Sequence, residues 1–303
     1  MSDATLSTLG NIRTKVRRLT KSPSSAQLTD ADIDSYVNTF VLYDIPSSLT
    51  INSLKSTLKF YTDPYVERYS TNTTVLTDPL YNFKNKYNLS SNNVTIAGRP
   101  AIFSESRSDF YDIYPNNSQL VSIGTGDGVT TLFAGTLTNI PFLSSNVTFT
   151  SVNTANQGLA AYDDGLGAFS GDAAGTINYV TGVYSLTFTS APKSGVTVYA
   201  QIVPYTPAIP DTILFYQDEF WVRPVPDQPY CVEIEVSIRP TELLSGTEMP
   251  DLTQWWQYIA IGAARKILID RLDFETANML DNEFRDQENM VLYRTVIQNS
   301  SRR

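Results

Sequence analysis

The amino-acid composition of the chain changes abruptly near residue 119, and this change restricts the folds open to it. Residues 119–206 contain 11 of the 15 glycines but only one basic residue, Lys193, and four aspartates. Short apolar runs here are separated by Gly, Pro and Asn, which is typical of strands joined by tight turns. We therefore expect an α+β protein: a sandwich-type all-β domain inserted at 119–206, and a discontinuous α+β core formed by 1–118 and 207–303.

Four runs within the insert have the length and the β-branched or aromatic content of strands. They are residues 146–152, 175–180, 183–189 and 196–203. Between the second and the third run, Thr181-Gly182 predicts a two-residue hairpin turn, because glycine readily adopts a positive φ.

The N-terminal residues 4–43 show the apolar spacing of two helices. The apolar stripe of the first helix consists of Leu6, Leu9, Ile12, Val16 and Leu19. Thr29 begins the second helix, with Asp32 completing a variant capping box. The buried side of this helix consists of Ile33, Tyr36, Val37, Phe40 and Val41, and Pro46 ends it.

The rest of the predicted core mixes short strands with C-terminal helices. Strands are expected at 57–61 and 93–97, and an alternating strand at 230–238 directs Glu233 and Glu235 to one face. Residues 251–298 predict a helical hairpin. The stripe of its first helix is Trp256, Ile259, Ala260, Ala263 and Ile267; its second helix carries Phe284, Val291, Tyr293 and Val296.

The chain has no histidine and one cysteine, Cys231. These counts exclude Ser-His-Asp catalysis, metal sites built on His, an internal disulfide and multi-Cys metal centres. The formal net charge of −9 argues against coating nucleic acid through a basic surface. These counts argue against most enzyme chemistry, and together with the motifs below they lead us to expect no cofactor, no resident metal and no enzymatic activity.

No run reaches the roughly 18 consecutive apolar residues of a membrane span. The first residues are polar and lack the apolar core of a secretory signal. We expect a soluble protein without membrane contact.

The spacing Gly124-x-Gly126-x-Gly128 invites comparison with phosphate-binding loops. Such loops have the pattern G-x-G-x-x-G or end in G-K-[ST], and they lead into a helix. Here no lysine follows, and residues 129–133 look extended. A tight turn that enters a strand is the favoured interpretation.

Two acidic sets could carry chemistry. Asp163, Asp164 and Asp172 could chelate calcium, but their spacing fits no calcium loop and Asp-Gly is an ordinary turn signal. Glu233 and Glu235 lie about 7 Å apart by strand rise, within the carboxyl separation of inverting glycosidases. Alternating glutamates more often mark a solvated or partner-facing side, and Cys231 is interpreted as a packing residue.

The strongest charge feature is a basic cluster on the first helix. It is a solvated helix face, or it docks to an acidic protein surface or to DNA phosphates without sequence-specific readout. The candidate partner-binding residues are Arg13, Lys15, Arg17, Arg18, Lys21, Trp255, Trp256, Arg302 and Arg303.

Several segments together resemble the head-to-tail adaptor (connector, or head-completion) proteins of tailed bacteriophages. In the predicted core they are residues 11–20 (NIRTKVRRLT), 28–38 (LTDADIDSYVN), 224–230 (PVPDQPY), 239–240 (RP), 255–260 (WWQYIA) and 288–294 (ENMVLYR). The insert resembles a small β-domain that recurs in phage structural proteins, through residues 124–128 (GTGDG) and 175–182 (GTINYVTG). The minimal adaptors are mainly helical and lack this insert.

The resemblance implies a non-enzymatic structural protein of the virion neck, at the head–tail junction, made in the host bacterial cytoplasm. It implies a ring of identical copies, commonly a dodecamer, that binds the portal protein and extends the DNA channel. The ring would dock a downstream tail or neck protein, and DNA would pass without specific binding. Two alternatives stay open: a tail or baseplate protein whose β-insert binds host surface glycans, and a neck protein that degrades peptidoglycan.

Overall fold

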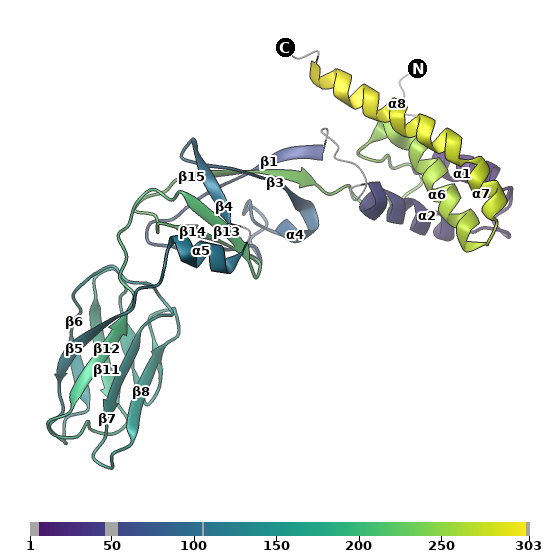
Figure 1. Ribbon diagram of the computed structural model, residues 1–303. Coiled ribbons are helices and arrows are strands. Elements are labelled where there is room, and N and C mark those ends of the chain that lie inside the picture. Colours follow the sequence, from purple (N-terminus) through teal and green to yellow (C-terminus); the bar gives the residue numbers. More distant parts are fainter. Residues whose placement is uncertain (1–5, 46–53, 105, 301–303) are drawn as a thin grey trace. The chain divides into compact units, whose positions relative to one another are not determined.

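The computed structural model describes residues 6–45, 54–104 and 106–300 (Figure 1). Helices lie at both ends of the described chain and strands of three sheets lie between them, which confirms the α+β class. The chain divides into two compact units. The first, called the helical unit, comprises Met1–Thr57, Lys84–Ser91 and Glu235–Arg303; the second, called the β unit, comprises Leu58–Phe83 and Asn92–Ile234.

The N-terminal helices form where the apolar spacing predicts them. Helix α1 is Leu9–Leu19 and helix α2 is Asp30–Thr39, extended by a π-helical turn, η2, at Phe40–Asp44. The capping box of Thr29 and Asp32 is present. Leu6 was expected on the buried stripe, and this is wrong: α1 begins only after its N-cap Thr8, so Leu6 lies before the helix and is exposed.

The C-terminal region contains more helices than the predicted hairpin. A 3₁₀ turn, η4, at Thr253–Trp255 leads into α6 (Trp256–Asp270), which is followed by α7 (Phe274–Met279) and α8 (Asp281–Ser300). Leu272 has a positive φ and ends α6, and Asp273 caps α7, so the turn contains a short additional helix. Tyr293, expected on the inner stripe, is exposed.

Helix α6 is the centre of the helical unit and contacts α1, α2, α7 and α8 (Figure 1). Four of its nine buried positions are small: Ala260, Gly262, Ala263 and Ala264. Small side chains allow neighbouring helices to approach closely. The buried side chain of Asn38 adds two hydrogen bonds of 2.9 Å to the backbone of Leu243, which fixes the chain before α6 against α2.

A seven-stranded sheet has the order β1-β15-β3-β4-β13-β14-β2. The strands are β1 (Lys55–Tyr61), β2 (Arg68–Ser70), β3 (Tyr87–Ile96), β4 (Arg99–Ser104), β13 (Thr212–Tyr216), β14 (Glu219–Arg223) and β15 (Cys231–Ile238). A short helix, α4 (Phe83–Lys86), precedes β3. Helix α5 (Arg107–Ile113) packs through Phe110 on Leu214 and Trp221. In β15, Val232, Ile234 and Val236 are buried, as the alternation predicts.

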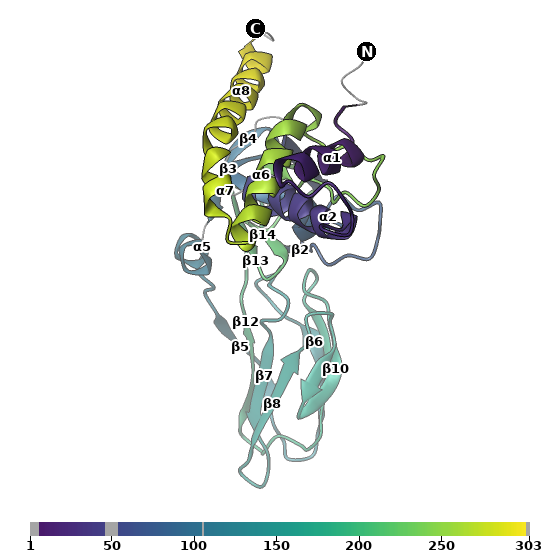
Figure 2. The same ribbon diagram turned by 90° about the vertical axis from the view of Figure 1, so that its right-hand side faces the viewer.

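Residues 119–202 form two facing sheets (Figure 2). One has the order β10-β11-β6 and the other β5-β12-β7-β8-β9. The strands are β5 (Gln119–Thr125), β6 (Leu132–Thr136), β7 (Thr148–Val152), β8 (Gly158–Asp163), β9 (Phe169–Gly171), β10 (Ala173–Ile177), β11 (Val183–Phe188) and β12 (Thr197–Ile202). Phe149, Leu186 and Val198 belong to one shared core, as in a β-sandwich. The boundaries 119 and 206 stay a prediction, because the β unit groups these strands with the segments on either side.

The hairpin between β10 and β11 differs from the predicted two-residue turn. Asn178 N–H donates to the carbonyl of Val183, and Gly182 N–H donates to the carbonyl of Asn178, so four residues form the loop. The side-chain oxygen of Asn178 accepts from Val180 N–H and Thr181 N–H. The turn at Asn178 therefore begins three residues before Thr181, where the two-residue turn was predicted. Gly182, with a φ of 74°, is the last residue before β11.

Candidate partner-binding site

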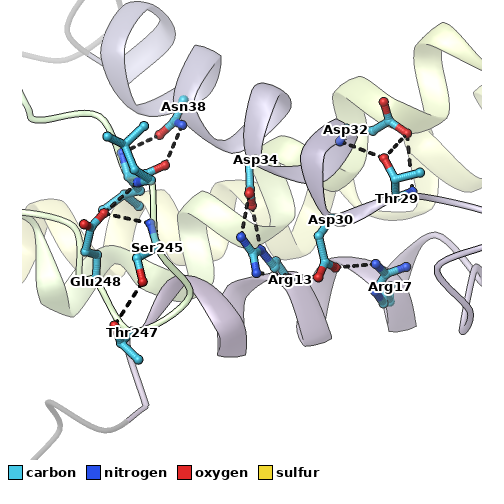
Figure 3. A network of polar contacts seen from close by, with 12 residues as sticks. Arg13, Arg17, Thr29, Asp30, Asp32, Asp34, Asn38, Ser245, Thr247 and Glu248 are labelled. Atoms are coloured by element: carbon cyan, nitrogen blue, oxygen red, sulfur yellow. Dashed lines mark hydrogen bonds and ion pairs between the residues drawn. The ribbon is translucent and has the colours of Figure 1, made fainter.

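The basic side chains of α1 are divided between internal ion pairs and solvent. Arg13 is held by Asp34 of α2 in a bidentate contact, Nε to Oδ1 at 2.7 Å and Nη2 to Oδ2 at 2.5 Å (Figure 3). This carboxylate raises the pKa of the Arg13 guanidinium above its usual range. Bidentate guanidinium–carboxylate pairs are among the stronger charge-assisted contacts, so Arg13 joins α1 to α2.

Arg17 makes the same kind of link one helical turn further along. Its Nη2 lies 2.5 Å from Asp30 Oδ1, and its Nη1 donates to the carbonyls of Ser24 and Leu28. The hydrogen bond from Arg17 lowers the pKa of Asp30. Arg13 and Arg17 therefore neutralise acidic residues of α2 within the same chain.

The remaining basic residues do not form a continuous surface with this pair. Lys15 Nζ lies 3.6 Å from Glu283 of α8. Arg18 and Lys21 are exposed, and within the described ranges neither side chain has an ion pair. The predicted basic face is thus reduced to two exposed cations, because the other three are directed at carboxylates of α2 and α8.

The two neighbouring tryptophans have different environments. Trp255 is 4% exposed and packs in the core of the helical unit against Tyr258. It is therefore unavailable to a partner in this conformation, which corrects its selection as a binding residue. Trp256, one residue later, is only partly buried and lines a groove. Arg302 and Arg303 lie outside the described residues.

We call this surface the Trp256 groove. Its lining includes Leu6, Gln254, Trp256, Gln257, Gln287 and Met290, and its volume is about 570 Å³. These side chains come from η4, the start of α6, the middle of α8 and the segment before α1. Among the described residues that line it, none is charged. Leu6 and the repeated glutamines were the sequence signals for it, and sequence analysis missed them.

A second feature missed by sequence analysis lies at the other end of α6. Ile269, Leu272, Phe274 and Met279 are large apolar side chains that are 42–74% exposed, and we call them the apolar corner. They surround the turn from α6 to α7. Four exposed charged residues, Asp270, Arg271, Asp273 and Glu275, stand among them in the sequence.

The two glutamates of β15 are paired with lysines of β1. Glu233 lies 3.0 Å from Lys59, and Glu235 lies 3.0 Å from Lys55. Cross-strand pairs of this kind explain the alternating glutamates by charge pairing along the sheet. Cys231 is free and partly buried, with its Sγ 3.9 Å from Glu233 Oε1.

The glycine-rich loop is a turn between β5 and β6. Gly126 N–H donates to Val196 and Gly128 N–H to Pro192, so the loop is held on the chain that precedes β12. A Cβ at Gly126 would lie 2.5 Å from the carbonyl oxygen of Lys193, which explains the need for glycine. The backbone amides at the two glycines are thereby used inside the protein.

Asp127 of this loop accepts hydrogen bonds from Thr130 Oγ1, Thr130 N–H and Val129 N–H. The bond from the Thr130 hydroxyl is the largest cause that lowers its pKa from 3.8 to about 2. When folding lowers the pKa of a carboxylate, the ionised group stabilises the folded state at pH values above the pKa of the unfolded state. This stabilisation is lost as the pH falls through the pKa of the folded state.

In the wild-type protein, the free energy of unfolding should fall as the pH is lowered from about 4 to about 2. We expect this fall to be smaller in Asp127→Asn, because the substituted side chain cannot be protonated. Thermal unfolding of both proteins across this range, followed by circular dichroism, measures the effect. Thr130→Ala should reduce the same fall, because it removes the leading cause of the lowered pKa. The same loss of stability at low pH in all three proteins would contradict a role for the Asp127–Thr130 contact in this pH dependence.

The aspartates considered as calcium ligands serve as caps for backbone amides. Asp163 accepts from Ser145, Val147 and Gly165 N–H; Asp164 accepts from Leu166 and Ala168 N–H. Asp172 accepts from Ala160 N–H. Across the described ranges, no three His, Cys, Asp or Glu side chains are grouped so that they could hold a metal ion.

Comparisons with known proteins add no identification. No protein-family model matches the chain, and no curated protein matches it. In the described part of the chain, no helix has the length and apolar character needed to cross a membrane.

Proposed function

We propose that this chain is a structural protein of a tailed-phage virion, a ring-forming head-to-tail adaptor at the neck. The observation that carries the proposal is the position of the segments that resemble adaptors. Those at 11–20, 28–38, 255–260 and 288–294 fall in or beside α1, α2, α6 and α8. Helix α6 contacts each of the other three helices. Segments from the two ends of the chain thus meet in one helical bundle, as the resemblance to a single adaptor module requires.

The charge distribution supports a scaffold beside a DNA path. Each chain carries −9, so twelve copies at −9 each carry −108. A conduit of this charge repels the DNA phosphates and lets the duplex slide without specific binding. The internal pairing of Arg13 and Arg17 favours the same view, because it removes two cations from possible contact with DNA.

The partners in this proposal are other copies of the chain, the portal protein and a downstream tail or neck protein. The test is to delete the gene in the phage and to image the resulting particles by negative stain. We expect DNA-filled heads without attached tails, and restoration of tails when the gene is supplied in trans. Normal tailed particles in its absence would contradict the adaptor role.

One observation favours the alternative of a tail or baseplate protein that binds host glycans. The outer face of the five-stranded sheet presents Leu120, Gln201, Thr148 and Tyr162 in one cross-strand row, with Tyr199 in the next row. None of these side chains is charged, and tyrosine offers both a stacking face and a hydroxyl. Binding of the full chain to host envelope glycans, abolished in Tyr162→Ala and Tyr199→Ala, would support this alternative.

A further inference from the structure

Loops of the sandwich and segments next to β2 and β14 line a cavity of about 470 Å³ within the β unit. Three tyrosines, Tyr65, Tyr179 and Tyr205, belong to its lining, and we call it the tyrosine cavity. Its volume falls within the range of about 300–1,000 Å³ that is usual for small-molecule sites. The proposed adaptor role does not use this cavity.

One carboxylate holds the part of the cavity wall that belongs to the sandwich. Asp163 Oδ1 accepts from the backbone N–H of Ser145 at 2.8 Å and from that of Gly165 at 2.7 Å. The hydroxyl of Tyr179 donates to the same oxygen at 3.3 Å. These three residues come from three different loops, and each of them lines the cavity. A single side chain thus joins three lining segments, so this part of the wall is formed without a ligand.

The segment before β2 forms another part of the wall and is also held by hydrogen bonds. The N–H of Tyr65 donates to the carbonyl of Pro226 at 2.8 Å, and the hydroxyl of Tyr69 donates to the carbonyl of Val66 at 2.8 Å. Tyr65 has a left-handed φ of 62°, and its side chain is 43% exposed. A side chain in this backbone region is strained, and such strain is concentrated at ligand sites.

Tyr205 supplies a hydroxyl that the protein itself does not use. Its backbone N–H donates to the carbonyl of Pro141 at 3.0 Å, and its ring packs on the buried side chains of Leu143 and Val225. Within the described ranges, its hydroxyl has no hydrogen-bond partner. Burial is the main cause that raises its pKa to about 12, and the nearby Glu67 raises it further. The hydroxyl therefore stays protonated at neutral pH and can donate to a ligand.

The charged side chains of the lining are already paired within the protein. Glu67 Oε1 lies 2.8 Å from Arg223 Nε, and Glu67 Oε2 lies 3.8 Å from Arg68 Nε. Among the described residues that line the cavity, Glu67 and Arg68 are the only charged ones. An ionised ligand would lose its hydration without gaining an unpaired counter-charge here. The cavity therefore favours a neutral ligand.

The neutral part of the lining combines ring faces with hydroxyl groups. Each tyrosine offers an apolar face and a hydroxyl, and Ser144 and Ser145 add two more hydroxyls. A hydrocarbon ligand would cover these hydroxyls without hydrogen-bonding to them, which costs free energy. A sugar meets both requirements, because its C–H faces stack on aromatic rings and its own hydroxyls pair with polar groups at the edge.

We propose that the tyrosine cavity binds a neutral oligosaccharide. The ring of Tyr65 stacks on a sugar ring, and the hydroxyl of Tyr205 and the carboxylate of Glu67 hydrogen-bond to sugar hydroxyls. Tyr162 and Tyr199 of the outer sheet face are not among the described residues that line this cavity. The site is therefore distinct from that face.

Saturation-transfer difference NMR on the full-length protein tests the proposal, with maltotriose, cellotriose and triacetylchitotriose as probes. We expect at least one probe to receive saturation from the wild-type protein, and a titration gives its Kd. Tyr205→Phe, which removes only a hydroxyl, should raise this Kd about two- to tenfold. Tyr65→Ala should raise it about tenfold or more, because the stacking ring is lost.

The matched control is Tyr162→Ala, which removes an exposed tyrosine of the sandwich outside the cavity and should leave the Kd unchanged. Thermal unfolding verifies that each variant is folded, and Tyr205→Phe keeps the buried ring in place. Absence of saturation transfer to all three probes would overturn the proposal. Binding that is weakened by Tyr162→Ala but not by Tyr205→Phe would also overturn it, because the sugar would then lie on the outer sheet face.

The sugar site and the adaptor role fail in different experiments. Normal tailed particles after deletion of the gene would contradict the adaptor role and leave the sugar titration unaffected. Loss of the sugar site would leave the imaging result unaffected, because the helices that resemble adaptors belong to the helical unit and the cavity belongs to the β unit.

Discussion

Replacing Glu67 with leucine is expected to destabilise the β unit by about 3–5 kcal/mol. Glu67 Oε1 lies 2.8 Å from Arg223 Nε, and the two side chains are only 11% and 6% exposed. Removal of the carboxylate would leave a buried guanidinium that, among the described residues, keeps only Asn116 as a side-chain hydrogen-bond partner. The cost arises from the uncompensated charge, so it exceeds that of losing an ordinary hydrogen bond.

Urea denaturation measures this effect. Trp255→Phe and Trp256→Phe leave Trp221 of the β unit, whose ring stacks with the guanidinium of Arg68, as the only tryptophan of the sequence. The matched control is Glu233→Leu, which breaks the solvent-exposed pair with Lys59 and should cost much less than Glu67→Leu, because water screens that pair. Similar costs for the two substitutions would show that burial does not govern the Glu67–Arg223 pair.

Gly262→Ala is expected to destabilise the helical unit although alanine has the higher helix propensity. A Cβ at residue 262 would lie 2.2–2.5 Å from three ring atoms of Phe40. That ring also packs on Tyr258 and Phe284, so moving it away from residue 262 would disturb both ring contacts. Overpacking of this kind costs about 1–3 kcal/mol, and more where the neighbours are rigid.

A double-mutant cycle separates this clash from other effects of the substitution. Phe40→Leu alone should destabilise through lost packing, but in its presence Gly262→Ala should become close to neutral, because the contacted ring atoms are gone. Thermal unfolding followed at the helical circular dichroism band measures all four proteins. Additive costs would contradict the proposed contact between Gly262 and Phe40.

Local features of the fold could be predicted from the sequence because neighbouring residues determine them. The capping box of Thr29 and Asp32 joins residues three apart, and the alternation of β15 follows from the geometry of an extended chain. The failures were also local. Leu6 fits the stripe of α1 by spacing alone, but Thr8 caps the helix after it, and Asn178 closes the β10–β11 loop before Thr181-Gly182 can form a two-residue turn.

The candidate site could be predicted only in part. Arg13 and Arg17 are four residues apart, as are Asp30 and Asp34, so the sequence contained a signal for two antiparallel helices joined by ion pairs. That signal becomes specific only when α1 and α2 are known to pack together. The sequence also did not show which of Trp255 and Trp256 is buried. The 3₁₀ turn η4 before α6 changes the direction in which successive side chains point, so α-helical spacing does not apply there.

The sequence by itself determined the α+β class, the helices at the two ends, the β-rich middle and the absence of histidine chemistry, because composition and short-range periodicity are properties of the chain alone. Only the tertiary structure decided which charges remain available and which apolar side chains stay exposed. It pairs Arg13 and Arg17 with α2, buries Trp255, and leaves the Trp256 groove and the apolar corner at opposite ends of α6. The physical reason is that exposure and charge pairing depend on contacts between segments far apart in sequence.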